Sequence, residues 1–380
     1  MLAIVNAYIV KPDHVIPDGV ILCKGKKIIY AGPKKPLPEN CEIIDAKGNF
    51  AGPGLIDIHT HAAGSYWYFN EPEKAARITL AHGTTSVYPA LYYDLDQKQY
   101  IESAKLNRKV SKSGAGRVIR GLYMEGPYLN PKFGANQSGN VWKGPIKKQE
   151  YMPIIEAAAD FAQFWSVAPE RPGVKGFVSD VRRANPNIVF TVAHSEAAPS
   201  DIEALIPLGL KIGTHHTNAT GDRPKYPEVR GVCVDETVNS RDEIYAEIIS
   251  DSKGIHVDPY MQRLILKIKG KDKIILISDA CVFDGPVPGE GYEGVTDINF
   301  DWDGQIAGSK LTLDVACRNF MMHTGSSLCD VFRFASLNPA RAMGDGSRGH
   351  ISEGADADII IVDGFMKVKK VILQGELQKI

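Results

Sequence analysis

The sequence has no closely spaced cysteine pair, no excess of charge of either sign and no long apolar run. Lysine plus arginine total 44 and aspartate plus glutamate 45, which argues against nucleic-acid or membrane-surface partners, because such proteins usually carry a basic excess. No apolar run approaches the roughly 18 residues that span a bilayer, and the first residues do not resemble a signal peptide. We therefore expect a cytoplasmic protein whose thiols are reduced and mostly buried: Cys23, Cys41, Cys233, Cys281, Cys317 and Cys329.

The two ends of the chain are rich in short strand-like runs. Up to about residue 50, short apolar runs alternate with Gly, Pro, Asp and Asn, a spacing typical of an all-β module. The same pattern returns at residues 357–363 and 368–375. Because chain termini often lie close together, we expect one small β-sandwich, formed by residues 1–51 and 348–380, rather than two unrelated β pieces.

Strands and helices alternate in the middle of the chain, residues 52–347. Helices are expected at residues 75–82, 98–110 and 152–162, and eight strands at 55–59, 83–89, 117–125, 164–170, 188–194, 211–215, 247–250 and 273–279. Eight apolar strands separated by helices predict an α/β fold of the (β/α)8 TIM-barrel type. A doubly wound open sheet is the alternative, although no Gly-x-Gly-x-x-Gly follows the first strand. Residues 286–309 predict a long loop or hairpin after the last strand.

Ligand-type side chains end five of these strands. His59 and His61 are two residues apart, so in a strand both imidazoles point to the same side. On its own, such a pair is as compatible with chance as with a metal site. Because barrel active sites lie at the carboxyl ends of the strands, we expect six groups to meet at one mouth: His59, His61, Glu125, His194, His215 and Asp279.

A set of imidazoles and carboxylates is what a metal-assisted hydrolase requires. Neutral imidazoles and a carboxylate hold one or two divalent ions, which lower the pKa of bound water toward ~7. A further carboxylate moves the proton from water to the leaving group. Of the other histidines, His256 is placed in a loop at the mouth, whereas we expect structural roles for His14, His82, His216, His323 and His350.

These residues and their flanks resemble the amidohydrolase superfamily, and within it the branch that deacetylates N-acetylated amino sugar phosphates. The resemblance covers most of the chain in the same order, through residues 53–61, 124–130, 167–170, 193–195, 214–219, 254–257, 278–280 and 304–313. Residues 338–342 and 354–358 also match, but many amidohydrolases share those two segments.

The resemblance implies a role for each matching position. Glu125, His194 and His215 would hold one metal ion, His59 and His61 would leave room for a second, and Asp279 would transfer the proton. The ion would be zinc, iron or manganese, all of which such ligands accept. Substrate contacts would come from Ala135, Asn136, Asn218, Ala219, Arg223, Arg230, His256, Ile306, Ala307 and Gly308.

The implied reaction releases acetate from N-acetylglucosamine 6-phosphate, and the implied assembly is a homodimer. Three departures from the family pattern leave the substrate open. Asn136 stands where the family has a histidine, either Arg223 or Arg230 would have to hold the phosphate, and residues 251–254 lack the usual Ala-Asp-Gly. One alternative is an amidohydrolase acting on another N-acyl amine or a cyclic amide. A second, a non-catalytic barrel, fits poorly with the complete ligand set.

Overall fold

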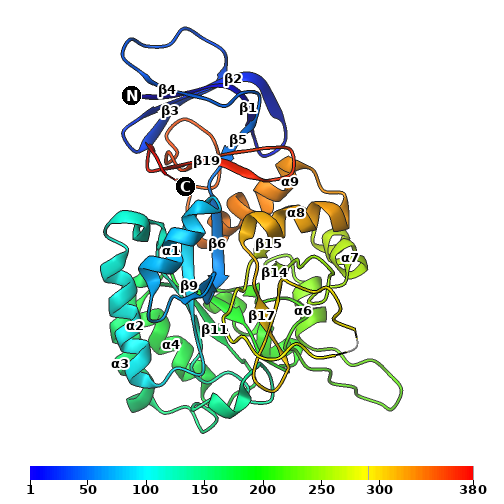
Figure 1. The fold of residues 1–380 in the computed structure, drawn as a ribbon. Coiled ribbons are helices and arrows are strands. Elements are labelled where there is room, and N and C mark those ends of the chain that lie inside the picture. Colours follow the sequence, from blue (N-terminus) through cyan, green and yellow to red (C-terminus); the bar gives the residue numbers. More distant parts are fainter. Residues whose placement is uncertain (290, 380) are drawn as a thin grey trace.

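The protein, described here by a computed structural model for residues 1–289 and 291–379, consists of a barrel and a smaller sheet domain (Figure 1). Eight parallel strands form the barrel in the order β15-β14-β13-β12-β11-β10-β9-β6. Their bounds are β6 Leu55–Thr60, β9 Thr84–Tyr92, β10 Leu122–Glu125, β11 Ala162–Val167, β12 Val189–Val192, β13 Leu210–Gly213, β14 Tyr245–Ile249 and β15 Ile274–Ile277. The predicted TIM barrel is confirmed, with each predicted strand present and its ends shifted by a few residues.

The barrel closes between its first and last strands. The Asp279 N–H donates to the His59 carbonyl oxygen over 2.9 Å, and the His61 N–H donates to the Ala280 oxygen over 3.0 Å. Below this point, the Ser278 hydroxyl donates to the buried carboxylate of Asp57 over 2.6 Å. Closure therefore brings the residues that follow β6 and β15 side by side at the carboxyl end of the barrel.

Helices follow the barrel strands and cover them on the outside (Figure 1). They are α1 Pro72–Ala81, α2 Gln97–Val110, α3 Lys148–Ala158, α4 Val174–Ala184, α5 Pro199–Glu203, α6 Val234–Ser240, α7 Pro259–Lys269 and α8 Leu313–Thr324, and then α9 Leu328–Phe332 and α10 Asn338–Met343. Helix α2 begins where Asp96 accepts a bond from the Gln99 N–H, as an N-cap does. The helix predicted at 152–162 ends early, at Ala158, because Ala159 has a φ of 27° and breaks the helical path.

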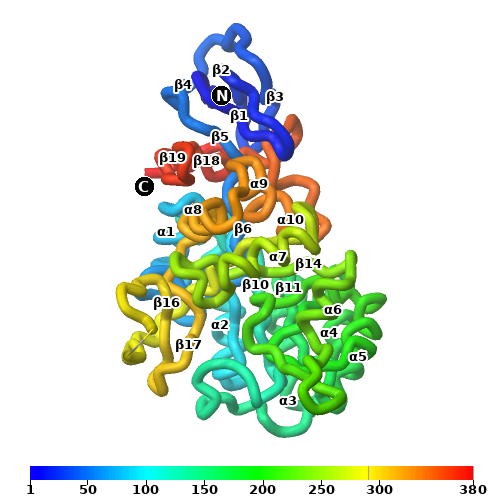
Figure 2. Tube along the Cα trace, turned by 90° about the vertical axis from the view of Figure 1, so that its right-hand side faces the viewer, coloured from blue at the N-terminus to red at the C-terminus, as the bar shows by residue number. Residues whose placement is uncertain are grey.

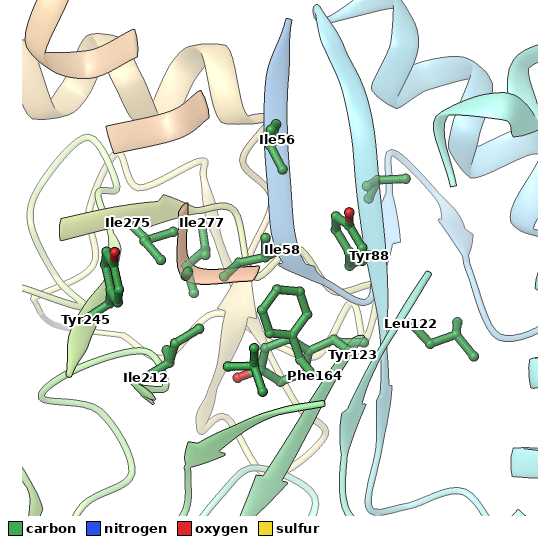
Figure 3. Packing of buried hydrophobic residues seen from close by; sticks show 14 of the residues in the cluster. Ile56, Ile58, Tyr88, Leu122, Tyr123, Phe164, Ile212, Tyr245, Ile275 and Ile277 are labelled. Carbon is green, nitrogen blue, oxygen red and sulfur yellow. The ribbon is translucent and has the colours of Figure 1, made fainter. Parts of the chain in front are cut away.

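The barrel core is filled by side chains that point inward from its strands. Ile56, Ile58, Tyr123, Phe164 and Ile277 are almost completely buried and pack together (Figure 3). The strands carry apolar residues on both faces because helices cover the outside while side chains fill the inside. This packing makes the barrel a rigid support for the groups at its mouth.

The two chain ends form one mixed sheet beside the barrel. Its strands follow the order β20-β19-β18-β5-β1-β2-β3, with β4 paired to β1. The bounds are β1 Leu2–Val10, β2 Val15–Lys24, β3 Lys27–Pro33, β4 Glu42–Asp45, β5 Phe50–Pro53, β18 Ile359–Val362, β19 Val368–Leu373 and β20 Glu376–Leu377. The prediction that both ends build one accessory domain is confirmed, while the residue limits of the domains stay predictions.

Two short hairpins extend the barrel mouth. Strands β7 Ala62–Ala63 and β8 Tyr66–Trp67 follow β6 directly. Strands β16 Ile298–Phe300 and β17 Ile306–Ser309 form the hairpin predicted after the last barrel strand, and Figure 2 shows it at one side of the barrel. Among the described residues, no helix is long and apolar enough to cross a membrane.

Candidate metal centre and substrate cavity

The six ligand-type residues predicted at the strand ends meet at the barrel mouth, and all are buried. Glu125 is the last residue of β10, while His194, His215 and Asp279 each follow their strand by two residues. These last three have positive φ angles of 43°, 29° and 47°. Such angles are costly for residues other than glycine and cluster at functional sites. The chain therefore turns sharply after each strand, at the positions that carry these side chains.

Glu125 lies at the centre of the cluster and faces four imidazoles. Its Oε1 lies 2.9 Å from His194 Nε2 and 3.3 Å from His215 Nε2. Its Oε2 lies 3.2 Å from His61 Nε2. Asp279 Oδ1 also faces two of these rings, 3.3 Å from His61 Nε2 and 3.6 Å from His59 Nε2. The arrangement provides two neighbouring sets of donors that share one carboxylate.

Three of the histidines have their Nδ1 atoms occupied elsewhere. His61 Nδ1 donates to the Ala90 carbonyl oxygen over 3.1 Å, and His215 Nδ1 donates to the Asn218 oxygen over 3.2 Å. His59 Nδ1 lies 3.1 Å from the carboxylate of Glu247. Because a carbonyl or carboxylate accepts the Nδ1 proton, each ring presents an Nε2 lone pair to the cluster once a metal ion has displaced the Nε2 proton. Such second contacts orient metal-binding histidines in proteins.

The donor set fits a divalent metal ion. Imidazole and carboxylate donors form two groups, and within each group the donor atoms lie within 4.8 Å of one another. One group is His59, His61 and Glu125, and the other is Glu125, His194 and His215. His59 Nε2 is buried and has no hydrogen-bond partner among the described residues. A buried nitrogen without a partner is costly, and a metal ion between these side chains would provide one. Imidazole nitrogens and carboxylates suit zinc, iron or manganese.

The electrostatics of the cluster favour bound positive charge. Burial disfavours ionisation of Glu125, but the facing histidines, with His59 foremost, outweigh it and hold the pKa of Glu125 well below its usual range. Burial opposes protonation of His61 too, yet Asp279 and Glu125 raise its pKa to about 9. At His194 burial prevails and lowers the pKa. The carboxylates are therefore ionised and ready to accept a cation, as metal binding requires.

A cavity of about 350 Å³ opens directly onto this cluster. Of the residues expected to contact substrate, seven line it: Ala135, Asn218, Ala219, His256, Ile306, Ala307 and Gly308. His256 Nδ1 lies 3.2 Å from Asp251, while its Nε2 has no partner among the described residues. That nitrogen is available to a molecule in the cavity.

Three expected contacts lie outside the lining. Asn136 Nδ2 donates to Asp94 over 2.6 Å, and burial raises the pKa of Asp94, which does line the cavity, to about 6. Arg223 donates to the Glu196 carbonyl oxygen over 3.2 Å. Arg230 pairs with Glu236 over 2.7 Å. Substrate binding by these three side chains stays a prediction.

Sequence reasoning missed the wall of the cavity, which is aromatic. Trp67 stacks on Tyr92 with ring centres 5.4 Å apart, and Phe283 meets Trp67 edge-on at 5.2 Å. These rings come from three separate segments, and no pattern in the sequence connects them. Lys132 also lines the cavity, and its Nζ lies 2.6 Å from Glu196. Glu247, whose carboxylate contacts His59, could have been recognised from the sequence, because it is a charged residue inside an otherwise apolar strand.

Comparisons with known proteins agree with this geometry. N-acetylglucosamine-6-phosphate deacetylase from Lysinibacillus sphaericus is 28% identical over 355 residues, covering 88% of this chain and 87% of the relative. N-acetylgalactosamine-6-phosphate deacetylase from Escherichia coli O157:H7 is 24% identical over 355 residues, covering 90% and 91%. The crystal structure of N-acetylglucosamine-6-phosphate deacetylase from Pasteurella multocida matches with a TM-score of 0.85 at 25% identity, covering 99% of each chain. The model of the amidohydrolase family matches residues 50–377, and the chain belongs to that family.

Proposed function

We propose that the protein is a metal-dependent deacetylase of N-acetylated amino sugars, with N-acetylglucosamine 6-phosphate as the leading substrate. The observation that carries this proposal is the buried cluster at the barrel mouth. Glu125 lies 2.9 Å from His194 and 3.3 Å from His215, and Asp279 lies 3.3 Å from His61. The relatives named above support the choice of substrate, although N-acetylgalactosamine 6-phosphate is supported by them as well.

The proposed chemistry divides the cluster into two parts. Glu125, His194 and His215 would hold one ion, and His59 and His61 would take part in a second site beside it. A bound ion supplies a Lewis acid that acidifies water and polarises the amide carbonyl. Zinc, iron and manganese all suit these ligands, so metal analysis of the purified protein decides the number and identity of the ions.

Asp279 is the proposed proton carrier. Its carboxylate takes the proton of the attacking water and delivers it to the nitrogen of the departing amine, which leaves as the amino sugar while acetate forms. His256, whose Nδ1 faces the Asp251 carboxylate, would accept a hydrogen bond from a substrate hydroxyl through its unpartnered Nε2. The backbone at Ala307 and Gly308, which line the cavity beside Asp279, would position the sugar.

The direct test is acetate release from N-acetylglucosamine 6-phosphate by the metal-loaded protein, with N-acetylgalactosamine 6-phosphate assayed alongside. We expect acetate and the free amine in equal amounts. Absence of acetate from both substrates, in protein shown to contain metal, would contradict the proposed substrate class. The homodimer expected from the resemblance is tested in the same preparation by light scattering.

A second candidate is deacetylation of an N-acyl amine that carries no phosphate. It is supported by the cavity lining, where the cation Lys132 is already paired with Glu196 and the wall is aromatic. Substrate pairs with and without the 6-phosphate separate the two candidates. A kcat/KM that favours the phosphorylated member supports the first, and equal or reversed values support the second.

A further inference from the structure

The turn after β15 brings a thiol to the metal cluster as well as a carboxylate. A nitrogen of His61, a carboxylate oxygen of Asp279 and Cys281 Sγ all lie within 4.8 Å of one another, and all three residues are buried. Cys281 also lines the cavity. In the sequence Cys281 stands two residues after Asp279, which makes a reactive role conceivable, although a small buried cysteine is more often a core residue.

The backbone holds this thiol in place from both sides. On one side, the N–H groups of His61 and Ala62 donate to the Ala280 oxygen over 3.0 and 2.8 Å. On the other, the Cys281 N–H donates to the Ser309 oxygen over 2.9 Å. Gly308, with a φ of 68°, leaves room for the sulfur, because a Cβ at that position would lie 2.9 Å from Sγ.

The unpartnered imidazole of His59 indicates that a ligand belongs next to His61 and Asp279, the two residues grouped with this thiol. The imidazole of His59 has no exposed surface, and its Nε2 has no hydrogen-bond partner among the described residues. That nitrogen lies 3.6 Å from Asp279 Oδ1, so it faces the space shared by Asp279 and His61. Leaving such a group unsatisfied is costly, and a cation bound between these side chains removes the cost.

We infer that Cys281 supplies a thiolate ligand to a metal ion held by His59, His61 and Asp279. On binding, the thiol proton passes to solvent and a sulfur lone pair forms the bond to the ion, with no change of oxidation state. Zinc binds sulfur at about 2.3 Å and nitrogen or oxygen at about 2.0–2.2 Å, so donors on one tetrahedral ion lie roughly 3.3–3.8 Å apart. The donor atoms of His61, Asp279 and Cys281, now within 4.8 Å of one another, would have to draw closer together around a bound ion.

A thiolate changes which metals this position selects. Soft sulfur ligands favour zinc or iron over manganese and magnesium, which prefer oxygen. The neighbouring set of Glu125, His194 and His215 contains no sulfur. The two positions therefore differ in preference, and the one that contains Cys281 is expected to bind zinc more tightly than manganese. The inference rests on the metal site of the proposed function.

X-ray absorption of the zinc-loaded wild-type protein tests the inference without any mutation. We expect a sulfur scatterer in the zinc shell at about 2.3 Å. The cobalt-loaded protein gives a second readout, a sulfur-to-cobalt charge-transfer band in the near ultraviolet. In Cys281→Ser both signals are expected to vanish, and zinc affinity at this position to fall at least about tenfold. Cys317→Ser is the matched control, since Cys317 is a fully buried cysteine in α8, and both signals are expected to persist.

The outcomes are distinguishable. Zinc that is bound without a sulfur scatterer, or signals that persist in Cys281→Ser, would overturn the thiolate assignment and leave the proposed deacetylase intact. If the protein binds no ion under any loading condition, both the thiolate assignment and the proposed metal-dependent mechanism are wrong. Circular dichroism of the variant excludes loss of fold as the cause of a lost signal.

Discussion

The metal cluster and the wall of the cavity are built in different ways. The six ligand-type residues lie at the ends of barrel strands, and closure of the barrel binds Asp279 to His59 through the backbone. Much of the wall comes from loops and hairpins, such as Trp67 in β8 and the segment around Gly134 and Ala135, although Tyr92 is the last residue of β9. The positions of the ligand-type residues are therefore set by the barrel strands, whereas the shape of the cavity depends largely on segments outside them.

Removing the carboxylate shared by the two donor groups should give the largest effect. Glu125 belongs to both the His59–His61 group and the His194–His215 group. In Glu125→Ala we expect metal content to fall at both positions and kcat/KM to drop by roughly 10³-fold or more. Metal analysis and acetate release check this. Glu203→Ala, at an exposed position in α5, is the control. Near-normal activity in Glu125→Ala would contradict the role of Glu125 in holding the metal.

Asp279→Asn separates proton transfer from metal binding. The amide keeps the shape of the carboxylate but cannot carry the proton, so we expect kcat to fall about 10²–10⁴-fold. The ion at Glu125, His194 and His215 should remain. Steady-state rates and metal analysis of the same preparation measure both effects. Asp303→Asn, at an exposed turn in the β16–β17 hairpin, should behave as wild type, and an unchanged rate in Asp279→Asn would remove Asp279 from the proposed role.

Gly134→Ala tests how tightly a loop residue constrains the cluster. Gly134 has a φ of 94°, and an added Cβ would lie 2.2 Å from the Tyr93 hydroxyl oxygen and 2.8 Å from His194 Nδ1. Displacement of His194 by even a fraction of an ångström is expected to lower kcat by up to about 10²-fold. In Gly144→Ala an added Cβ would meet no atom within 4 Å, so this control should keep its rate. Equal rates in both variants would show that the loop does not constrain the ligand.

Trp67→Ala removes part of the wall while leaving the strand ends intact. Aromatic contacts of this kind are worth about 0.5–1.5 kcal/mol, so KM should rise roughly two- to tenfold with little change in kcat. Trp302→Ala, which removes an exposed ring outside the cavity lining, is the matched control. A fall in kcat without a change in KM would place Trp67 in the chemical step instead.

The smallest effect is expected for the double variant Arg223→Ala, Arg230→Ala. Both guanidinium groups lie outside the cavity lining and bond to exposed parts of the surface. Exposed pairs contribute about 0–1 kcal/mol, so kcat/KM should change by less than about fivefold for phosphorylated and unphosphorylated substrates alike. A loss confined to the phosphorylated substrate would instead support the prediction that one of these arginines holds the phosphate.

The strand-end residues were predictable because barrel topology links position to function. A polar residue that directly follows an apolar strand, such as His194 or Asp279, must lie at the mouth wherever it stands in the chain. The wall was not predictable, since Trp67, Tyr92 and Phe283 meet only through tertiary packing. Cys281 falls between these cases. Its position after β15 placed it near the mouth, but only the three-dimensional structure revealed its proximity to His61.

The metal dependence of acetate release decides whether the cluster at the barrel mouth is a hydrolytic site. Acetate release from N-acetylglucosamine 6-phosphate and from its unphosphorylated form is measured before chelation, after removal of metal, and after reloading with zinc. We expect activity on at least one of these substrates that disappears with the metal and returns in proportion to the metal restored. Equal hydrolysis by the metal-free protein, or none by protein with its metal in place, would contradict it.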